Sequence, residues 1–460
     1  MPPPGIISYG FHIPVYRLSR ELITAAWNTS CIVGSKAVAG VDEDSVTMAI
    51  QAAGRSLARV PSPKINALFF CSTTAPFAER SNSALIAAAL DLPEWCLALD
   101  LGGSLRVGTD GIGVAFDLAK AGQEHVLVTV ADCRNPEPGS VDEQFTADAA
   151  AALIIGTDSP LAIVEAKWAR YDDFLDTVRR SRDKYFTSFG NRLSQSRYRE
   201  NVSSTVDRLL TSAGISKSDI SRVILPSLDG VVHSRTALSL GFSAEQVQGA
   251  PAENCGFAGA AASCLSLCSA LDMASPGDRL LVVGYGEGAD GFILRVTDHI
   301  RSAERMPFTN SHLISLSSYQ LYLTTRENLD RPQGNINMSN VFYAKEEQQN
   351  IRLHGSKCTK CGLVQFPIAQ ICSGCGTVRQ LKTIALSKCG HVFTYTIDYL
   401  YSSVLGPTIM TVVDLDGGGR LYLQMTDARP EEVAIGMPVT LTFRRLHDIH
   451  YVWKCSPRRE

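Results

Sequence analysis

Four cysteines in the last third of the chain have the spacing of a metal site. Cys358 and Cys361 form one C-x-x-C pair, and Cys372 and Cys375 form a second pair after ten intervening residues. Each pair places two thiolates on one tight turn, and the glycine after each pair supplies the backbone freedom that such a turn needs. We expect one structural zinc ion per chain, because four sulfurs leave no position for a substrate. Two disulfides are the alternative, which a reducing compartment disfavours.

Two glycine-rich segments, 111–116 and 284–291, have the composition of nucleotide-binding loops. A dinucleotide fingerprint runs from a strand through glycines into a helix, whereas "GYGEGADG" at 284–291 runs into "FILRV", which is typical of another strand. The segment therefore predicts a tight hairpin turn, and we expect no nucleotide cofactor.

Single acidic and histidine side chains are weaker candidates. Asp42, Glu43 and Asp44 precede a helical pattern, so we expect them to cap that helix and complement its dipole in the first turn, not to act as paired catalytic carboxylates. His233 lies near the end of a predicted strand, and a lone histidine suits a structural, an exposed or a catalytic role.

The composition restricts the partners and the compartment. Lys and Arg number 43 against 46 Asp and Glu, and the chain has no basic stripe of the kind that binds nucleic acid. The N-terminus lacks a secretory pattern, and no apolar run reaches the roughly 18 residues of a membrane helix. We expect a cytoplasmic protein with mostly buried, reduced thiols at the other nine cysteines: Cys31, Cys71, Cys96, Cys133, Cys255, Cys264, Cys268, Cys389 and Cys455.

The first 325 residues alternate short β-branched runs with Ala-rich helical segments. These segments are apolar almost all round, so they should be buried between layers of an α/β domain. Residues 116–157 and 271–298 share the order helix, turn, strand, strand, which indicates a duplicated half-domain. Residues 326–345 are polar and aperiodic, and predict a linker.

The remainder predicts a small second module. A helix and the zinc-binding knuckle occupy 346–380, and an all-β domain occupies 381–460. Its strand candidates are 391–400, 408–415, 420–427 and 438–446, and "DGGG" at 416–419 is a hairpin signal.

Several motifs resemble the thiolase superfamily, and within it the hydroxymethylglutaryl-CoA synthase and ketoacyl synthase III branch. They are "GVDEDSVTMAIQAA" (40–53), "LRVGTDGIGVAFDLAKAG" (105–122), "ADCRNPEPGS" (131–140), "QFTADAAAALIIG" (144–156), "LSLGFSAEQV" (238–247), "ENCGFAGAA" (253–261) and "PGDRLLVVGYGEGADG" (276–291). The resemblance implies a duplicated α-β-α-β-α domain. The segment 353–376 resembles the rubredoxin-like zinc-ribbon plus OB-fold family that accompanies thiolase-like enzymes, which implies that the protein handles acyl-CoA.

The resemblance also places the branch's catalytic positions on this chain. The acyl-accepting cysteine falls on Leu105, the glutamate base near Thr73 and the histidine near Pro226, while the asparagine is retained as Asn254. Leucine forms no thioester, threonine is a far weaker base than a carboxylate, and proline has no side-chain donor. The usual acyl-cysteine route is therefore closed, unless the alignment shifts by one residue and places Ser104 at the nucleophile position.

Three functions remain open. The first is an enzyme that makes or breaks a carbon–carbon bond beside an acyl-CoA thioester without an acyl-cysteine, as in an aldol or retro-aldol reaction. Its candidate groups are Asn254, Cys255, Tyr285, His233, Asp229 and Glu79. The second is a non-catalytic acyl-CoA-binding or scaffold subunit, paired with a thiolase-like chain that supplies the cysteine. The third is an acyltransferase that uses Ser104 or Cys255. In each case we expect a homodimer.

Overall fold

The computed structural model describes residues 2–30, 32–61, 63–226, 232–249, 255–306, 313–327, 340–403, 405–447 and 449–458. The chain divides into two compact units. The first comprises Met1–Ala39, Asp44–Ala87 and Leu92–Tyr322, and the second comprises Gly40–Glu43, Ala88–Asp91 and Leu323–Glu460.

The first unit is built on one nine-stranded sheet. Its strands, in spatial order, are β11 (Arg222–Ile224), β12 (Arg279–Tyr285), β13 (Gly288–Val296), β8 (Ala162–Tyr171), β1 (Gly5–His12), β7 (Asp148–Gly156), β6 (His125–Cys133), β4 (Ala67–Cys71) and β5 (Leu97–Leu101). A short antiparallel pairing of β1 with β8 joins the two halves. The turn predicted at 284–291 is confirmed, because β12 and β13 form an antiparallel hairpin.

The two halves of the sheet repeat one another. In the order β1-β7-β6-β4, the first two pairings are antiparallel and the third is parallel. The order β8-β13-β12-β11 has the same directions. β5 extends the first half in parallel with β4, and at the corresponding place in the second half a parallel bridge joins Val223 to Val247. The predicted duplication is confirmed.

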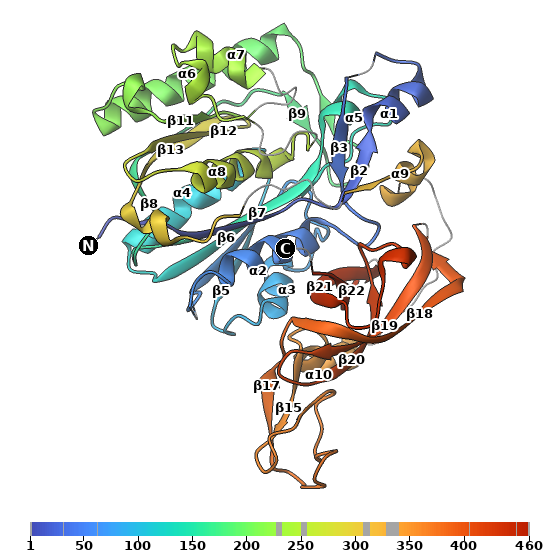
Figure 1. Ribbon diagram of the computed structural model, residues 1–460. Helices are drawn as coiled ribbons and strands as arrows, with labels where there is room; N and C mark the ends of the chain where they lie inside the picture. Colours follow the sequence, from blue (N-terminus) through green and yellow to red (C-terminus); the bar gives the residue numbers. More distant parts are fainter. Residues whose placement is uncertain are drawn as a thin grey trace. The chain divides into compact units, whose positions relative to one another are not determined.

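Helices complete the predicted α-β-α-β-α layers (Figure 1). α4 (Val107–Lys120) and α8 (Ala262–Met273) lie between the two half-sheets and contact both. α2 (Ser45–Leu57) and α3 (Asn82–Ala89) cover the first half-sheet, and α6 (Arg192–Ala213) and α7 (Val232–Ser239) cover the second. A Cβ on Gly108 of α4 would meet the carbonyl of Ala260 at 2.8 Å, so a glycine permits this close packing.

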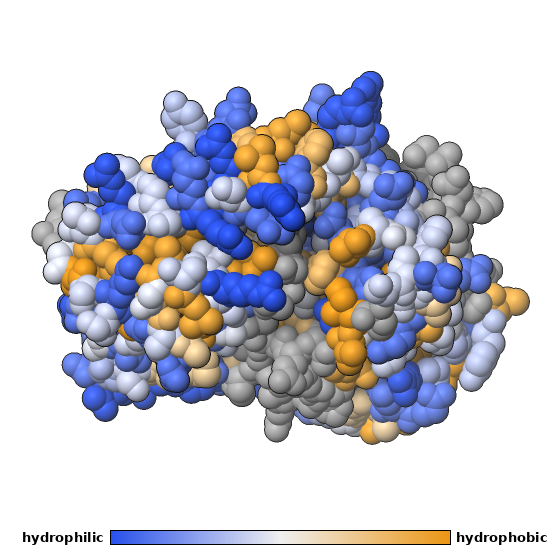
Figure 2. All heavy atoms as spheres, turned by 90° about the horizontal axis from the view of Figure 1, so that it is seen from above, coloured by the Kyte–Doolittle hydropathy of each residue, from blue (hydrophilic) through white to orange (hydrophobic). Residues whose placement is uncertain are grey.

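The outer helix α6 is amphipathic. It buries Tyr198, Val202, Val206 and Leu209, whereas its other face is polar. Figure 2 looks onto this side of the molecule, which is largely hydrophilic with separate hydrophobic areas. Shorter elements of the first unit are β2 (Tyr16–Ser19), α1 (Arg20–Trp27), β3 (Ser35–Val38), α5 (Val141–Phe145), β9 (Thr177–Val178), β10 (Thr187–Ser188) and β14 (Ile314–Ser315); α9 (Tyr319–Thr325) spans the unit boundary.

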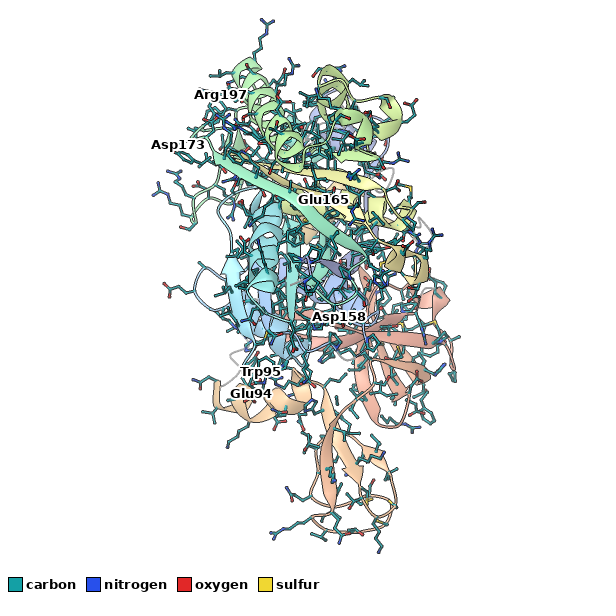
Figure 3. All side chains as sticks on the ribbon, turned by 90° about the vertical axis from the view of Figure 1, so that its left-hand side faces the viewer. Glu94, Trp95, Asp158, Glu165, Asp173 and Arg197 are labelled. Atoms are coloured by element: carbon teal, nitrogen blue, oxygen red, sulfur yellow. The ribbon has the colours of Figure 1, made fainter. Side chains whose placement is uncertain are left out.

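One edge of the sheet is apolar and exposed. β5 is the terminal strand in the sheet order. Trp95, which directly precedes it, is 63% exposed, and Leu97 and Leu99 are 49% and 39% exposed. Figure 3 labels Trp95 with its neighbour Glu94 at this edge. An apolar edge strand has unpaired backbone groups, so it is a natural place for another strand to pair.

Of the three acidic residues predicted to cap α2, only Asp44 does so. Asp44 is the N-cap of α2 and forms a capping box with Thr47, as expected. Asp42 and Glu43 do not lie in the first helical turn, because the helix begins at Ser45. They group with the second unit, where Glu43 pairs with the buried Arg444 at 2.5 Å and Asp42 pairs with Lys454 at 2.8 Å. Buried cations need such partners.

The second unit contains a zinc-ribbon-like sheet and a closed barrel. The sheet has the order β16 (Val364–Gln365), β15 (His354–Cys358), β17 (Leu381–Ala385). The barrel runs β18 (Cys389–Ser403), β19 (Gly406–Leu415), β20 (Arg420–Met425), β22 (His450–Pro457), β21 (Pro438–His447), which confirms the predicted OB-fold.

Two details of the second unit differ from the prediction. α10 (Asn340–Asn350) begins inside the segment predicted as a linker, and β22 was absent from the predicted strands. β22 completes the barrel through β21 and β20, and these tertiary pairings are not visible in local sequence. In the part of the chain that the structure describes, each helix is too short or too polar to cross a lipid bilayer.

Candidate functional site

Two cavities in the first unit meet at Leu105. The first cavity, of about 400 Å³, and the second cavity, of about 220 Å³, share Leu105 and Thr177 as lining residues. Leu105 directly precedes Arg106, the N-cap residue of α4. The N-terminal end of a helix carries a partial positive charge and stabilises negative charge nearby. The junction is therefore a favourable place for a polarised carbonyl oxygen.

The other two positions to which the resemblance assigns catalytic residues line these cavities as well. Thr73 and Ser104 line the first cavity, and Pro226 lines the second. The side chain of Thr73 is already engaged, because its hydroxyl and its backbone N–H donate to the buried carboxylate of Asp132 at 2.8 and 2.7 Å. Ser72 Oγ and the backbone N–H of Ala260 donate to the same carboxylate. Thr73 therefore supports a structural network and supplies no base.

Ser104 is also engaged. Its hydroxyl donates to the backbone carbonyl of Gly286 at 2.9 Å, in the turn between β12 and β13. A nucleophilic serine needs its proton directed at a base. The geometry therefore gives Ser104 a role in fixing the turn against the start of α4 and does not favour the nucleophile role.

The second cavity holds the candidate Tyr285. Its ring packs edge-on against Tyr198 at 4.9 Å between ring centroids, and the hydroxyl of Tyr198 donates to the carbonyl of Pro226 at 2.6 Å. Burial, followed by the charge of Asp176, raises the pKa of Tyr285. The phenol therefore stays protonated near neutral pH and can donate a hydrogen bond or a proton.

The remaining candidates lie elsewhere or outside the described residues. Cys255 is 1% exposed and packs against Ala37 and Ala147. Burial raises the pKa of its thiol to about 11, so it is a core thiol and not an activated nucleophile. His233 on α7 is buried and Glu79 is exposed, and neither lines either cavity. Asp229 and Asn254 lie outside the described residues.

Three charged residues of the first cavity were missed from the sequence: Arg134, Glu287 and Arg179, whose guanidinium donates to the carbonyl of Thr73 at 2.8 Å. Glu287 stands in the turn "GYGEGADG", which we interpreted only as a hairpin, and Arg134 stands in "ADCRNPEPGS". Arg134 is 4% exposed, and its guanidinium stacks on Phe186 at 3.9 Å from the ring centroid. The charge within each motif was the available signal that these residues face the site. Where such a side chain points depends on the tertiary fold.

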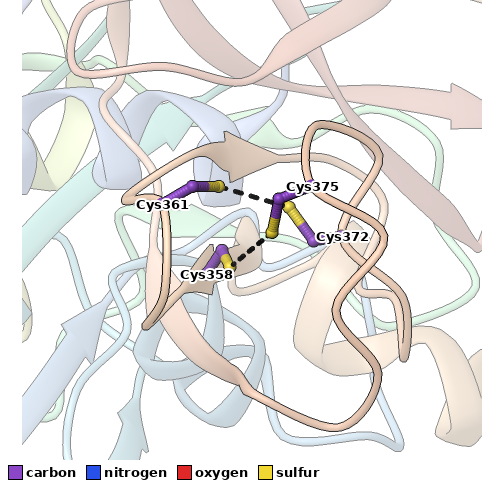
Figure 4. A group of neighbouring side chains, drawn as sticks. All are labelled: Cys358, Cys361, Cys372 and Cys375. Atoms are coloured by element: carbon purple, nitrogen blue, oxygen red, sulfur yellow. Dashed lines mark hydrogen bonds between the residues drawn. The ribbon is translucent and has the colours of Figure 1, made fainter.

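The four predicted metal ligands converge in the second unit (Figure 4). Their Sγ atoms all lie within 4.8 Å of one another. The pairs Cys358–Cys375 and Cys361–Cys372 are 3.7 and 3.5 Å apart. Tetrahedral zinc with Zn–S bonds of about 2.3 Å requires sulfurs roughly 3.8 Å apart. The glycines after the two pairs have φ angles of +79° and +69°, which side chains rarely adopt. The residues fit a zinc ion.

The comparisons with known proteins agree with this geometry. The family model "3-Oxoacyl-[acyl-carrier-protein (ACP)] synthase III C terminal" matches residues 210–295, and "ChsH2, C-terminal OB-fold domain" matches residues 383–444. A hydroxymethylglutaryl-CoA synthase from Methanosphaera stadtmanae is 32% identical over 333 residues, which are 70% of this chain and 96% of that protein. The chain belongs to the hydroxymethylglutaryl-CoA synthase family.

Solved structures share the fold of this hydroxymethylglutaryl-CoA synthase family member. PksG, an HMG-CoA synthase from Bacillus subtilis, has a TM-score of 0.62 at 17% identity. The match covers 76% of this chain and 94% of PksG. Synthase III FabH from Pseudomonas aeruginosa has a TM-score of 0.59 at 21% identity, covering 66% of this chain and all of FabH. This family member therefore has a thiolase-like domain with an added zinc-ribbon and OB-fold unit.

Proposed function

We propose that this family member acts on CoA thioesters and makes or breaks a carbon–carbon bond beside the thioester without an acyl-cysteine. The observation that carries the proposal is Leu105, which stands where the two cavities meet and α4 begins. Among the described residues that line the two cavities there is no cysteine. Family membership supports the CoA thioester, and the lining supports a non-covalent route.

Such a reaction needs positioned acid and base groups and a positive environment for the enolate oxygen. The start of α4 supplies partial positive charge at the junction. Tyr285, protonated through its burial, is the candidate hydrogen-bond donor that stabilises the oxygen of the aldol alkoxide from the second cavity. Leu105 adds an apolar wall against which a thioester sulfur can pack.

The second unit supports a role in holding CoA. The match to the OB-fold domain of ChsH2 and the zinc-compatible cysteines are the observations behind this part of the proposal. The zinc would tie the two C-x-x-C turns together and would not touch substrate, because four cysteines complete its coordination. We further propose a soluble cytoplasmic homodimer.

A non-catalytic acyl-CoA-binding subunit is the second candidate. The engaged hydroxyls of Thr73 and Ser104 favour it, because they leave two positions of the family's site without a free reactive group. In that case a thiolase-like partner chain would supply the cysteine.

One experiment separates the candidates. Purified protein is incubated with short acyl-CoAs and small aldehydes or ketones, and with β-hydroxyacyl-CoAs for the reverse reaction, while thioester products are followed by mass spectrometry. Turnover that survives prior treatment with iodoacetamide supports the proposal. Acyl-CoA binding without turnover identifies a binding subunit, and turnover abolished by alkylation of a cavity residue contradicts the non-covalent route.

A further inference from the structure

The first cavity contains a carboxylate without a described hydrogen-bond donor. Glu287 lines this cavity, and among the described residues its Oε2 atom is buried and has no hydrogen-bond partner. A buried carboxylate oxygen costs free energy when no donor satisfies it. Its lone pairs remain free to accept a proton, and a reaction site can use that property.

The backbone of Glu287 is strained as well. Its φ angle is +45°, a left-handed conformation that residues other than glycine seldom adopt. Backbone strain of this kind costs free energy and concentrates at functional sites. Close packing enforces the position, since a Cβ on Gly286 would meet Ser104 Oγ at 2.6 Å and the backbone nitrogen of Leu105 at 2.9 Å. The turn thus holds Glu287 next to Leu105.

A buried cation lines the same cavity. Nη1 of Arg134 is also buried and lacks a hydrogen-bond partner among the described residues. Burial lowers the pKa of Arg134, while the charges of Asp132 and Asp142, and to a smaller extent Glu287, oppose that change. Arginine stays protonated at any ordinary pH. One cavity therefore has both a proton acceptor and a fixed positive charge.

We propose that Glu287 is the acid–base residue of this site and that Arg134 is a positioning residue whose charge favours the enolate. The inference rests on the function proposed above. It assigns the base to the β12–β13 turn, since the resemblance places the family's glutamate near Thr73, whose hydroxyl is engaged by Asp132. Glu287 lies two residues beyond Tyr285, and the two side chains line different cavities that meet at Leu105.

The step balances without a further reactant. The α-carbon C–H bond of the thioester breaks, its proton moves to the carboxylate of Glu287, and its electron pair forms the enolate. The enolate carbon then attacks the carbonyl carbon of the second substrate, forming the new carbon–carbon bond and an alkoxide. The proton held by Glu287 returns to that alkoxide. The reverse sequence cleaves the bond.

Exchange of the α-proton tests the assignment before any second substrate is added. Acetyl-CoA or butyryl-CoA is incubated with the full-length zinc-loaded protein in D₂O, and deuterium uptake at the α-carbon is followed by mass spectrometry. We expect Glu287→Gln to reduce the exchange rate at least 100-fold without changing acyl-CoA affinity more than about threefold, in line with the usual worth of a general base. Glu124→Gln, at an exposed turn before β6, is the matched control and should exchange like wild type.

Two further variants guard against a simple folding defect. Glu287→Asp keeps the charge, tolerates a positive φ better than glutamate does, and shortens the reach by one methylene, so it should fold and lose about tenfold in exchange. Arg134→Gln should slow exchange about tenfold, and Arg134→Lys should recover part of that loss by restoring the charge.

The outcomes separate this inference from the proposed function. Exchange that is equal in wild type and Glu287→Gln overturns the role of Glu287 and leaves the carbon–carbon chemistry standing. Wild-type exchange that requires Glu287 supports the inference even if no acceptor yields a product. A wild-type protein that binds acyl-CoA without exchanging the α-proton overturns both.

Discussion

Ser104 donates a hydrogen bond from Oγ to the backbone carbonyl of Gly286 at 2.9 Å. The bond joins the segment before α4 to the β12–β13 turn, although 182 positions separate the two residues in sequence. Tyr285 and Glu287 flank Gly286 in that turn, and they line the two cavities that share Leu105. The arrangement of the candidate site depends on this contact.

Gly286→Ala should destabilise the first unit. The added Cβ would lie 2.9 Å from the backbone nitrogen of Leu105 and 3.1 Å from that of Arg106, and backbone atoms cannot move aside cheaply. Overpacking of this kind costs about 1–3 kcal/mol in the free energy of unfolding, measurable by urea denaturation. Gly113→Ala in α4, where nothing lies within 4 Å, is the control and should be neutral or stabilising. Equal stability of Gly286→Ala and wild type would show that the turn is loosely packed.

Leu105→Cys should make the junction of the cavities reactive. The introduced thiol would sit at the start of α4, where the helix end lowers thiol pKa values. We expect iodoacetamide to label position 105 within minutes, detected by peptide mass spectrometry, and to weaken acyl-CoA binding more than tenfold. Cys255 should remain unlabelled in the same sample, since burial raises the pKa of its thiol to about 11. Leu238→Cys, exposed on α7, should be labelled without any loss of binding.

Asp290 should make stability depend on pH. Burial, and then the charge of Asp110, raise the pKa of Asp290 to about 7, although a hydrogen bond from Thr109 opposes the shift. An unfolded aspartate titrates near 3.9, so the folded state binds more protons between about pH 4 and 7. The free energy of unfolding should therefore fall as pH rises through that window, by roughly 4 kcal/mol for this one group.

Asp290→Asn tests that dependence directly, because asparagine can still accept the hydrogen bond from Thr109. The difference in unfolding free energy between the variant and wild type should grow from pH 5 to pH 7 and then level off. Asp298→Asn, an exposed change, should show no such trend. A flat difference for Asp290→Asn would mean that this carboxyl is ionised throughout the range.

The second unit should bind one zinc ion per chain. We expect about one equivalent by plasma mass spectrometry in the purified protein, and close to none after Cys372→Ala, since three thiolates bind zinc much more weakly than four. The same substitution should lower the melting temperature of the second unit. Cys389→Ala, a cysteine outside the cluster, should keep its zinc. One equivalent in Cys372→Ala would rule out the four-sulfur site.

Homodimerisation should use the exposed edge at β5. Two copies related by a two-fold axis would pair their β5 strands and bury Trp95, Leu97 and Leu99. Sedimentation should give the mass of two chains for wild type and of one chain for the double substitution Leu97→Lys and Leu99→Lys. The pair Val341→Lys and Ile435→Lys, exposed in the second unit, is the control. A single-chain mass for wild type would contradict the dimer.

The sequence by itself determined what depends on local spacing and on periodicity. Two C-x-x-C pairs specify their own turns, so the four sulfurs could be predicted to meet without knowledge of the rest of the chain. Alternating strand and helix patterns, repeated once, were sufficient for the duplicated α/β domain. The motif around Leu105 likewise located the start of α4.

Only the tertiary structure decided what the remaining polar residues do. Glu43 pairs with Arg444, about four hundred residues away, although local sequence favoured a role in the adjacent helix. Cys255 lies within the segment 253–261 that resembles the family, yet its side chain is buried in the core. Glu287 and Arg134 come from segments far apart in sequence. Glu287 lies in the β12–β13 turn, which packs onto the start of α4, and Arg134 directly follows β6; both line one cavity. The burial and direction of such side chains follow from long-range packing, and no local pattern encodes them.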